Sequence, residues 1–251
     1  FQKMFKAIVG NFERSLVNKY YDAVIQVNPY QVEWMTKYGI SNNKIYFIPN
    51  GVPELSFKKV NNKEFEKKYN LKDKFVISYL GRIQDYKGID QVIRVIPKLR
   101  KDAVFLVMGK DAGDLTRLKN LTNNLNVNDR VIFTGEISDD EVIQGLSLSK
   151  IFILPSEWEA FGISILQAMA QGNAIISTRT EGGRFLVDKE NGFLYNFNDI
   201  KDLENKLKVL IADKSALKKI SKLNTENIKK AKKFLWSNIV KDLEKLYYKL
   251  K

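Results

Sequence analysis

The sequence predicts an α/β fold built on a Rossmann-like, doubly wound parallel sheet with helices on both faces. Short β-rich runs alternate with segments of helical periodicity along most of the 251 residues, which is the pattern of a layered α/β protein. Several of the runs are almost entirely apolar, as expected for strands that are buried on both faces. The chain is 44% hydrophobic with 14 Gly and 5 Pro, so we expect a folded core and exclude a low-complexity linker protein.

The elements follow in a simple order along the chain. The first 48 residues predict a helix, a strand, a helix and a strand, which are too few strands for a sheet of their own. The turn-rich stretch Pro49 to Pro53 is the best domain boundary. After it, the alternation predicts a six-stranded doubly wound sheet ending near Lys214, and then a basic helical tail from Leu217 to Lys251. The predicted strands are Ala23 to Val27, Ile45 to Ile48, Phe75 to Leu80, Ala103 to Met108, Val131 to Thr134, Ile151 to Leu154, Ala174 to Ser177 and Gly192 to Tyr195, and the predicted crossover helices are Ile89 to Leu99, Leu115 to Leu125, Asp139 to Leu148, Gly162 to Ala170 and Leu203 to Ile211.

The basic excess predicts partners that carry phosphate. Lys and Arg number 42 against 29 Asp and Glu, and a formal net charge of +13 attracts nucleotides, nucleic acid or anionic lipid head groups. The absence of Cys and His excludes, within this chain, disulfides, the usual zinc ligand sets, Cys nucleophiles and His-dependent triads. We find no membrane-spanning run and no signal peptide, and therefore expect a cytoplasmic protein. Because the chain begins with Phe1, we expect it to be a processed product or a piece of a longer protein.

A first candidate site is the glycine-bearing turn Gly81 to Gly88, which follows a predicted strand and opens a helix. In doubly wound sheets, ligands bind outside the carboxyl ends of the strands. Glycine lets backbone approach a ligand, a helix amino end favours anions, and Arg82 and Lys87 supply two cations for a diphosphate. The alternative is that both are ordinary solvated surface charges. The turn lacks the Gly-Lys-Ser/Thr ending of a Walker A loop.

A second candidate is the segment Pro155 to Gly172, which follows the predicted strand Ile151 to Leu154. Its Phe161-Gly162 turn is expected to present backbone N–H groups at a helix start, where they suit a phosphate. Glu159 and Gln167 can both reach that helix end and would suit the hydroxyls of a sugar. The alternatives are a carboxylate that balances the helix dipole and a solvated helix residue.

A third turn, Thr180 to Arg184, follows a third strand at the same predicted sheet edge. Its alternative is a plain tight turn with a surface arginine. The coincidence of three such turns at one edge is a stronger signal than any one of them.

With these residues in view, the chain resembles the retaining glycosyltransferases of the GT-B fold, in particular glycosyltransferase family 4, also called group 1. The resemblance covers nearly the whole chain and rests on both residue types and spacing. The matching segments are Gly81-Arg82, Lys87-Gly88, Pro155-Ser156, Glu159 to Gly162, Ala168 to Gly172, Gly182-Gly183 and Asn191-Gly192, with Asn50 to Val52 similar to the interdomain hinge and Trp236 to Tyr248 similar to the closing helix.

The resemblance implies a role for each matching residue. Arg82 and Lys87 would neutralise the donor diphosphate without a metal, and Glu159 would hold hydroxyls of the donor sugar. Together with Gly81, the donor-binding residues would be the backbone of Phe161, Gly162, Ile163 and Ser164, the ribose-contacting Gln167, and Glu136 and Ile137 near the base. No cofactor and no metal site is implied, because the nucleotide-diphosphate sugar is the donor substrate and Asp139-Asp140-Glu141 is better explained as a helix start.

The resemblance also implies a domain organisation and partners. Residues 1–52 would be the remnant of an amino-terminal, acceptor-side Rossmann-like domain with the hinge, residues 53–230 the nucleotide-sugar-binding domain, and residues 231–251 the closing helix. The acceptor would be a carbohydrate or a lipid-linked sugar, and the isolated chain, lacking most of the acceptor side, would be weakly active or inactive.

The sequence departs from the family pattern at two places. Gln167 stands where the family usually has Glu, eight positions after Glu159, and an amide can still hydrogen-bond a ribose hydroxyl. Gly182-Gly183 continues into Arg184-Phe185, not into the usual Pro-Glu pair, which leaves the geometry of that turn open.

Three other functions stay open on the sequence alone. The chain could be a non-catalytic nucleotide-sugar-binding subunit that needs a partner chain, or a sugar epimerase of similar fold. A nucleic-acid binder is suggested only by charge, and we see no basic helix with base-reading residues and no aromatic nucleic-acid-binding strand, so we expect no nucleic-acid partner.

The amino-terminal segment suggests an anionic membrane surface as a further partner, at the inner face of the membrane. Its apolar residues fall on one helical stripe with the basic residues beside it, and the alternative is that the stripe packs on a sheet. The stripe consists of Phe1, Met4, Phe5, Ile8, Phe12 and Leu16.

Overall fold

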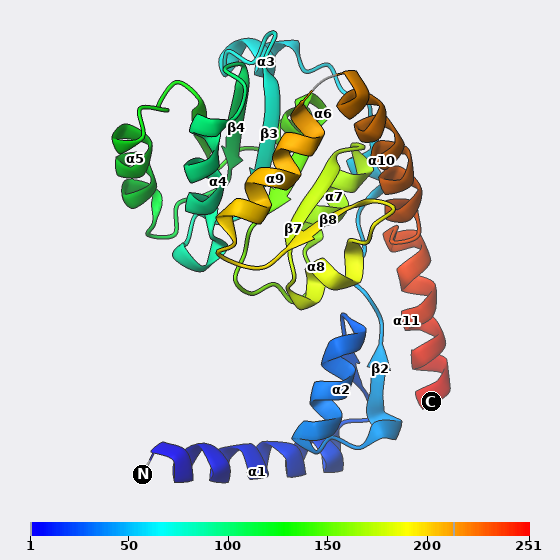
Figure 1. Ribbon diagram of the computed structural model, residues 1–251. Helices are drawn as coiled ribbons and strands as arrows, with labels where there is room; N and C mark the ends of the chain where they lie inside the picture. Colours follow the sequence, from blue (N-terminus) through cyan, green and yellow to red (C-terminus); the bar gives the residue numbers. More distant parts are fainter. Residues whose placement is uncertain (1, 213) are drawn as a thin grey trace. The chain divides into compact units, whose positions relative to one another are not determined.

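The computed structural model describes residues 2–212 and 214–251, which form two compact units (Figure 1). The small unit consists of residues 1–51 and 236–251, and the large unit consists of residues 52–235. Phe1, and the side chains of Met4, Phe5 and Ile8 in the predicted apolar stripe, lie outside what is described.

The large unit contains, among the described residues, a parallel sheet of six strands in the order β5-β4-β3-β6-β7-β8. This order is that of a Rossmann-like doubly wound sheet, so the predicted fold class is confirmed. The chain order reverses between β3 and β6, which are neighbours in the sheet, and this is the switch point where such folds bind ligands. The strands are β3 (Phe75–Leu80), β4 (Ala103–Met108), β5 (Val131–Gly135), β6 (Ile151–Leu154), β7 (Ala174–Thr178) and β8 (Gly192–Tyr195).

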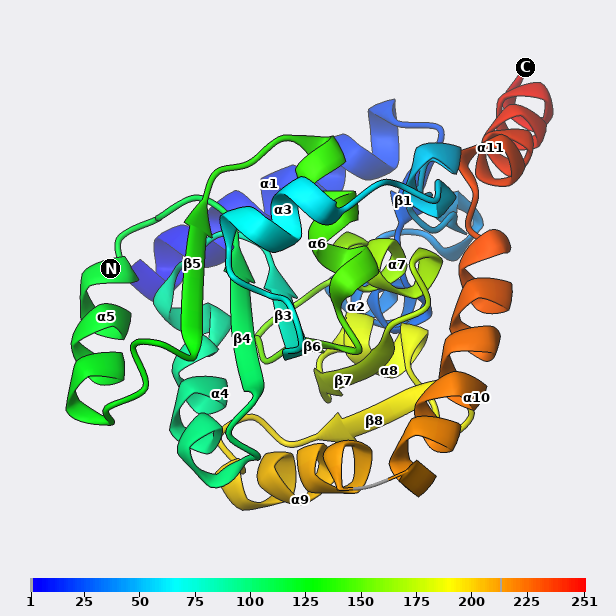
Figure 2. The same ribbon diagram turned by 90° about the horizontal axis from the view of Figure 1, so that it is seen from above.

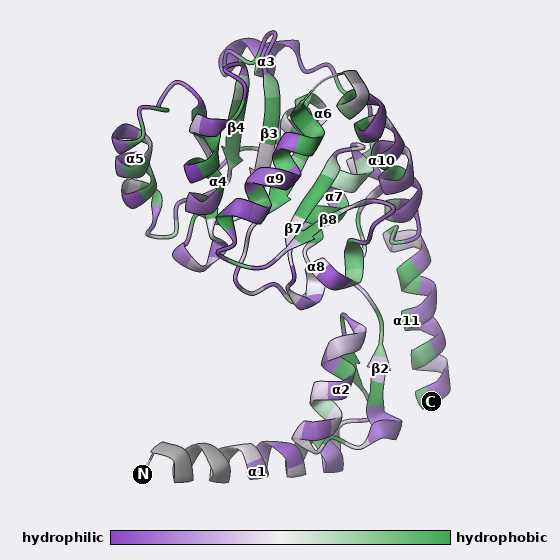
Figure 3. Cartoon of the chain, in the orientation of Figure 1, coloured by the Kyte–Doolittle hydropathy of each residue, from purple (hydrophilic) through white to green (hydrophobic). Residues whose placement is uncertain are grey.

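The central strands form the hydrophobic core. All six residues of β4 and all four of β6 are buried, because helices cover the sheet on both faces. Figure 2 shows α4 and α9 along one face and α6 and α7 along the other, with α10 packed against α7. Figure 3 shows the same division by colour, with hydrophobic strands and hydrophilic residues on the outward parts of the helices. The helices of this unit are α3 (Lys63–Lys68), α4 (Ile89–Val95), α5 (Leu115–Asn124), α6 (Asp139–Leu148), α7 (Ile163–Ala170), α8 (Glu181–Leu186), α9 (Ile200–Ile211) and α10 (Lys214–Lys232).

One predicted helix ends earlier than expected, and the predicted helical tail is divided in two. The helix predicted over Ile89 to Leu99 ends at Val95 and continues as a 3-10 turn over Ile96–Lys98, because Pro97 has no N–H to donate within an α-helix. The predicted helical tail from Leu217 to Lys251 is two helices, α10 and α11 (Trp236–Leu250). Between them, the carbonyl of Phe234 accepts a hydrogen bond from the Val52 N–H at 2.7 Å, a contact that a continuous helix would not offer.

The small unit has the predicted order of helix, strand, helix and strand, followed by α11 from the end of the chain. Its strands form a parallel pair in which Ile25 lies opposite Tyr46. Of its large apolar side chains whose burial is described, few are buried: Phe12 is 65% exposed and Trp34 is 59% exposed. None of the described helices has the length and apolar content needed to cross a membrane. The elements are α1 (Gln2–Tyr20), β1 (Val24–Gln26), α2 (Pro29–Tyr38), β2 (Ile45–Phe47) and α11.

Candidate functional site

The candidate site lies at the switch point, where the loops after β3 and β6 leave the sheet. Pairing between these two strands runs from Ile77 opposite Ile151 to Ser78 opposite Phe152, and stops two residues before both strands end. The two loops are therefore not held together by the sheet ladder. Other contacts must fix their separation.

The loop after β3 carries the two predicted cations. Arg82 is exposed, and its Nη2 donates to the Tyr86 hydroxyl at 3.3 Å. The fully buried Tyr79 fixes the backbone of this loop, because its hydroxyl donates to the Arg82 carbonyl at 2.7 Å. Burial raises the pKa of Tyr79 well above its ordinary value, so this hydroxyl remains a donor. The Gly81 N–H already donates to the Met108 carbonyl at 3.0 Å, so Gly81 supplies shape to the loop but no free N–H.

Lys87 and Glu159 meet across the switch point. Lys87 Nζ lies 2.9 Å from Glu159 Oε2, and the two side chains are only 13% and 20% exposed. The Glu157 N–H also donates to the Tyr86 carbonyl at 2.7 Å, which joins the same two loops through their backbones. The structure thus brings together two of the three residues predicted to be catalytic, a cation and a carboxylate from different strands.

The loop after β6 leads into α7 through Gly162. Gly162 is the N-cap residue in a left-handed conformation, with φ of +89°, and it offers no side-chain acceptor to the first turn of the helix. The N–H groups of that turn are therefore suited to an acceptor from outside the helix. Ile163 is 45% exposed at the helix start, whereas Ser164 and Gln167 are half-buried.

The Phe161 side chain does not point to a ligand. It is 3% exposed and packs in an aromatic cluster with Phe185 and Phe234, at ring-centroid distances of 5.9 and 6.3 Å. Any contribution of Phe161 to binding must therefore come from its backbone, as expected from the sequence.

The segment Thr180 to Arg184, predicted as a turn, is instead the start of helix α8. The Thr180 hydroxyl caps the helix by accepting from the Gly183 N–H at 3.1 Å, and the Gly182 N–H donates to the Glu159 carbonyl at 2.9 Å. A Cβ on Gly182 would lie 2.4 Å from the Phe161 carbonyl oxygen, so only glycine permits this approach. Two N–H groups of this segment therefore already donate to acceptors in the protein. One of these bonds connects helix α8 to the loop that carries Glu159.

Glu136 and Ile137 follow β5, two strands away from β3 in the sheet. Glu136 is exposed and lies 3.5 Å from Lys110 Nζ. The neighbouring Ser138 and Glu141 form a capping box at the start of α6, which confirms that Asp139-Asp140-Glu141 is a helix start. Among the described residues, no group of three or more Asp and Glu side chains is arranged to hold a metal ion.

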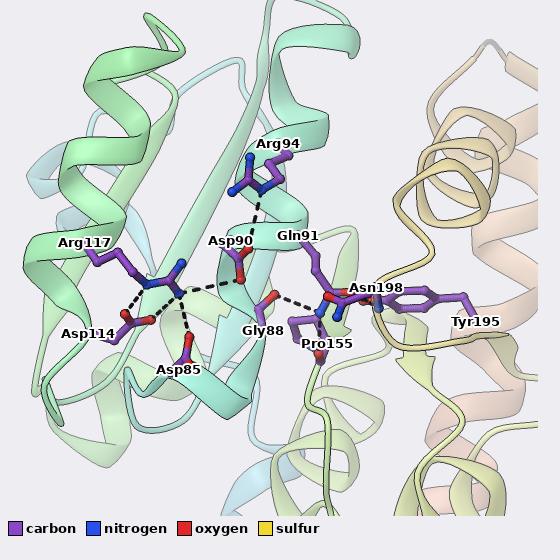
Figure 4. Close-up of polar contacts among 10 residues, drawn as sticks. All are labelled: Asp85, Gly88, Asp90, Gln91, Arg94, Asp114, Arg117, Pro155, Tyr195 and Asn198. Carbon is purple, nitrogen blue, oxygen red and sulfur yellow. Dashed lines mark hydrogen bonds and ion pairs between the residues drawn. The ribbon is translucent and has the colours of Figure 1, made fainter.

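Figure 4 shows the polar contacts of Gln91 and Arg117 near Gly88, the residue after Lys87, although nothing in the sequence pointed to either side chain. Arg117 Nη2, on α5, lies 3.2 Å from Asp85 Oδ1 and 3.7 Å from Asp90 Oδ1. These two aspartates precede and follow Lys87 in the sequence. Its hydrogen bond to Asp114 raises the pKa of Arg117 above its ordinary value, so the guanidinium stays charged. Gln91 is fully buried on α4 and contacts three loops.

Comparison with known proteins identifies the family of the chain. Residues 61–233 match the family model described as glycosyl transferases group 1. An uncharacterised glycosyltransferase of Methanocaldococcus jannaschii is 31% identical over 189 residues, which cover 73% of this chain and 47% of that protein. The N-acetyl-alpha-D-glucosaminyl L-malate synthase of Bacillus anthracis is 26% identical over 211 residues, covering 82% and 54%. The chain thus spans about half the length of the curated relatives it matches.

Solved structures show the same fold at low sequence identity. The Anabaena protein HepE, solved in complex with UDP and glucose, has a TM-score of 0.86 at 19% identity, covering 96% of this chain and 66% of that one. Sucrose-phosphate synthase from Thermosynechococcus elongatus has a TM-score of 0.84 at 24% identity, covering 96% and 61%. The fold is that of GT-B glycosyltransferases, and because the family model covers more than half of the residues, the chain belongs to the glycosyl transferases group 1.

Proposed function

We propose that this chain carries the donor-binding half of a glycosyltransferase that moves a sugar from a nucleoside diphosphate sugar to an acceptor, with retention at the anomeric carbon, as in glycosyltransferase family 4. The observation that carries the proposal is the Lys87–Glu159 pair at the switch point of the sheet. A cation and a carboxylate side by side match the two parts of such a donor, a diphosphate and a polyhydroxylated sugar.

The pair also suggests how the donor enters. Without a donor, Lys87 and Glu159 satisfy each other's charge in a site that is mostly shielded from water. When the diphosphate binds, its oxygens take the Lys87 ammonium, and the released Glu159 carboxylate accepts hydrogen bonds from the sugar hydroxyls. Each partner thus replaces a contact that it already makes, which limits the cost of desolvation.

In this proposal, Arg82 and Lys87 stabilise the negative charge that develops on the diphosphate as the sugar–phosphate bond breaks. Arg82 is exposed and reaches Tyr86 only through a long hydrogen bond, so its side chain is free to turn toward the phosphates. These two cations perform the neutralisation that a divalent ion performs in other transferases, and no cofactor is needed.

The remaining contacts of the donor are assigned by position. The Gly162 to Ser164 backbone at the start of α7 would meet phosphate and sugar, Gln167 one turn further would meet the ribose, and Glu136 with Ile137 would lie near the base. The uncapped start of α7 supports the first assignment.

A second candidate is a donor-binding module that acts only with a partner, because the chain spans about half the length of the curated relatives it matches. We assign residues 1–52 to the remainder of an acceptor-side domain, 53–230 to the donor domain and 231–251 to the closing helix. Supporting this, the described residues of the small unit form one parallel strand pair, and apolar side chains such as Ile25 and Phe47 on those strands are 41% and 42% exposed. Parallel sheets are normally covered on both faces.

The acceptor is a carbohydrate or a lipid-linked sugar in this proposal, and the protein works in the cytoplasm at the inner face of a membrane. Phe12 and Leu16, the described members of the apolar stripe, are 65% and 36% exposed, which supports contact with an anionic lipid surface. Sedimentation with anionic vesicles, but not with neutral ones, is the expected result. A protein that stays in the supernatant with both, even at low salt, would contradict this part.

The donor site is tested by thermal unfolding in the presence of UDP, GDP, ADP and inorganic pyrophosphate. A ligand at a hundred times its dissociation constant should add about 2.7 kcal/mol of stability. We expect at least one nucleoside diphosphate to raise the melting temperature, and Arg82→Ala to reduce that rise without lowering the melting temperature of the free protein. If none of the nucleotides changes the melting temperature, the proposal is wrong.

A further inference from the structure

Gln91 makes four hydrogen bonds to three separate loops at the carboxyl edge of the sheet (Figure 4). Its Nε2 donates to the Pro155 carbonyl at 2.9 Å and to the Gly88 carbonyl at 3.3 Å. Its Oε1 accepts from the Tyr195 hydroxyl at 3.2 Å and from the Asn198 N–H at 2.9 Å. The side chain is fully buried, so none of these contacts is shared with solvent.

Only an amide fits this position. Two carbonyl oxygens require two N–H donors, and two donors require an acceptor oxygen with two lone pairs, which is the inventory of a glutamine side chain. An ionised Glu could not donate to Pro155 and Gly88, and a Leu would leave the Pro155 carbonyl buried without its donor. The Gly88 carbonyl would keep only the backbone N–H of residue 91, which donates to it at 3.1 Å. Gly88 is equally fixed, because a Cβ there would lie 2.2 Å from Gln91 Nε2 and 2.3 Å from the Pro155 carbonyl oxygen.

The loops that Gln91 joins are those that carry the candidate site. Gly88 directly follows Lys87, and Pro155 precedes Glu159 by four residues in the loop after β6. The sheet cannot set the distance between these loops, because pairing of β3 with β6 ends at Ser78 and Phe152. Beyond that point the amide of Gln91 spans the gap, together with the bond from the Glu157 N–H to the Tyr86 carbonyl at 2.7 Å. Tyr195 at the end of β8 and Asn198 in the loop that follows hold the amide in place.

We propose that Gln91 is a positioning residue that sets the separation of Lys87 and Glu159 and thereby the fit of the donor diphosphate, a role that rests on the proposed function. Tyr195 supports it by orienting the amide oxygen. Gln91 itself does not touch the donor; it acts through the backbone on either side of the ion pair.

The test is a double-mutant cycle between Gln91 and Lys87, with UDP and inorganic pyrophosphate as probes in calorimetric titrations. Each variant is measured at a temperature where circular dichroism shows it to be folded. We expect Gln91→Leu to weaken binding of both probes by about tenfold, because a small displacement of a binding group is costly. In a Lys87→Ala background the same change should cost less than about twofold, because residues that act as a unit are not additive.

Two further variants separate positioning from general stability. Asn227 is a fully buried amide at the opposite edge of the sheet, and Asn227→Leu should lower the melting temperature while leaving UDP affinity unchanged. Tyr195→Phe removes one of the four hydrogen bonds and should weaken UDP binding by about threefold, which keeps the test decisive if Gln91→Leu does not fold.

The outcomes distinguish the two proposals. If the unaltered chain binds UDP and pyrophosphate, but folded Gln91→Leu, or Tyr195→Phe in its place, binds them equally well, the positioning role is wrong and the proposed function stands. The positioning role is also wrong if Gln91→Leu costs as much in the Lys87→Ala background as in the unaltered chain. If the unaltered chain binds no nucleoside diphosphate and no pyrophosphate, the proposed function fails and the positioning role fails with it.

Discussion

Polar clusters of different kinds lie at the amino ends and at the carboxyl ends of the strands in the six-stranded sheet. At the amino ends of β7 and β8, Asn173, Asn191 and Asn227 are at most 1% exposed. The Asn227 amide donates to the carbonyls of Asn173 and Asn191 and accepts from the Asn191 side chain, and the Asn173 amide donates to the carbonyls of Leu146 and Ser149. At the carboxyl ends of β3 and β6, Lys87 and Glu159 are charged and 13% and 20% exposed. The first cluster is neutral and closed, which suits a structural joint. The second is charged and reachable, which suits a ligand.

This difference explains why one cluster should govern stability and the other affinity. A buried amide network fixes the packing of α10 on the sheet, since Asn227 on that helix donates to the carbonyls of Asn173 and Asn191, both at 2.8 Å. The Lys87–Glu159 ion pair contributes less to stability because most of the water around both charges had to be removed to form it.

The largest expected effect of the contrast between the two strand ends is a loss of stability on substitution of Asn227. Asn227→Leu removes the donor to the buried carbonyls of Asn173 and Asn191. It also removes one of the two acceptors of the Asn191 side-chain amide, which keeps the Leu186 carbonyl. We expect a loss of roughly 3 kcal/mol in the free energy of unfolding, because each orphaned buried group costs about 1–3 kcal/mol. Urea denaturation measures it. A loss of UDP affinity in the folded variant would show that the two clusters are coupled and not separate.

The next effect concerns Lys87. Lys87→Ala removes a charge-assisted contact worth about 1.5–3 kcal/mol, so UDP affinity should fall tenfold or more in calorimetric titrations. The same change leaves the Glu159 carboxylate partly buried without its cation, so stability should also fall somewhat. The double variant Lys87→Ala with Glu159→Gln removes the unpaired charge and should recover stability but not UDP affinity. Recovery of both would mean that the pair is a structural ion pair and not a ligand site.

The smallest effect concerns Gln167, where the chain departs from its family. A carboxylate holds a ribose hydroxyl more strongly than an amide does, by about 1 kcal/mol, so Gln167→Glu should tighten UDP binding several-fold. Inorganic pyrophosphate has no ribose, and its affinity should change much less. Equal changes for both ligands, or none for either, would place Gln167 outside the site.

Most of the fold and part of the site could be predicted from the sequence, and the reasons differ. The strands were predictable because buried runs such as Phe75–Leu80 and Ala103–Met108 are almost purely apolar. Helix α8 was missed because Gly182 and Gly183 favour a turn in isolation, and only the approach of the Phe161 carbonyl to Gly182 and of the Thr178 carbonyl to Gly183 explains them. Pro97 lies inside a periodic segment and is a recognisable helix stop signal in the sequence. That the chain continues there as a 3-10 turn is seen only in the structure.

Within the site, Lys87 and Glu159 were found through motif spacing, but their contact was not, since it depends on how two loops 72 residues apart are placed. Gln91 and Asn227 left no signal at all. A polar residue in an amphipathic helix looks solvated in the sequence, and only its buried partners, which come from distant loops, show that it is not.

The most direct test of the donor site is a crystal structure of the chain, determined from crystals soaked with UDP. We expect the diphosphate within hydrogen-bond distance of Lys87 Nζ and Arg82, at the switch point between β3 and β6, with Glu159 released from Lys87. The chain offers a second place to compare, because α10 and the loop before β8 line a cavity with three lysines and two carboxylates, Lys189, Lys219, Lys222, Glu190 and Glu226. A diphosphate bound against those lysines, with the Lys87–Glu159 contact intact, would contradict the assignment of the donor site to the switch point.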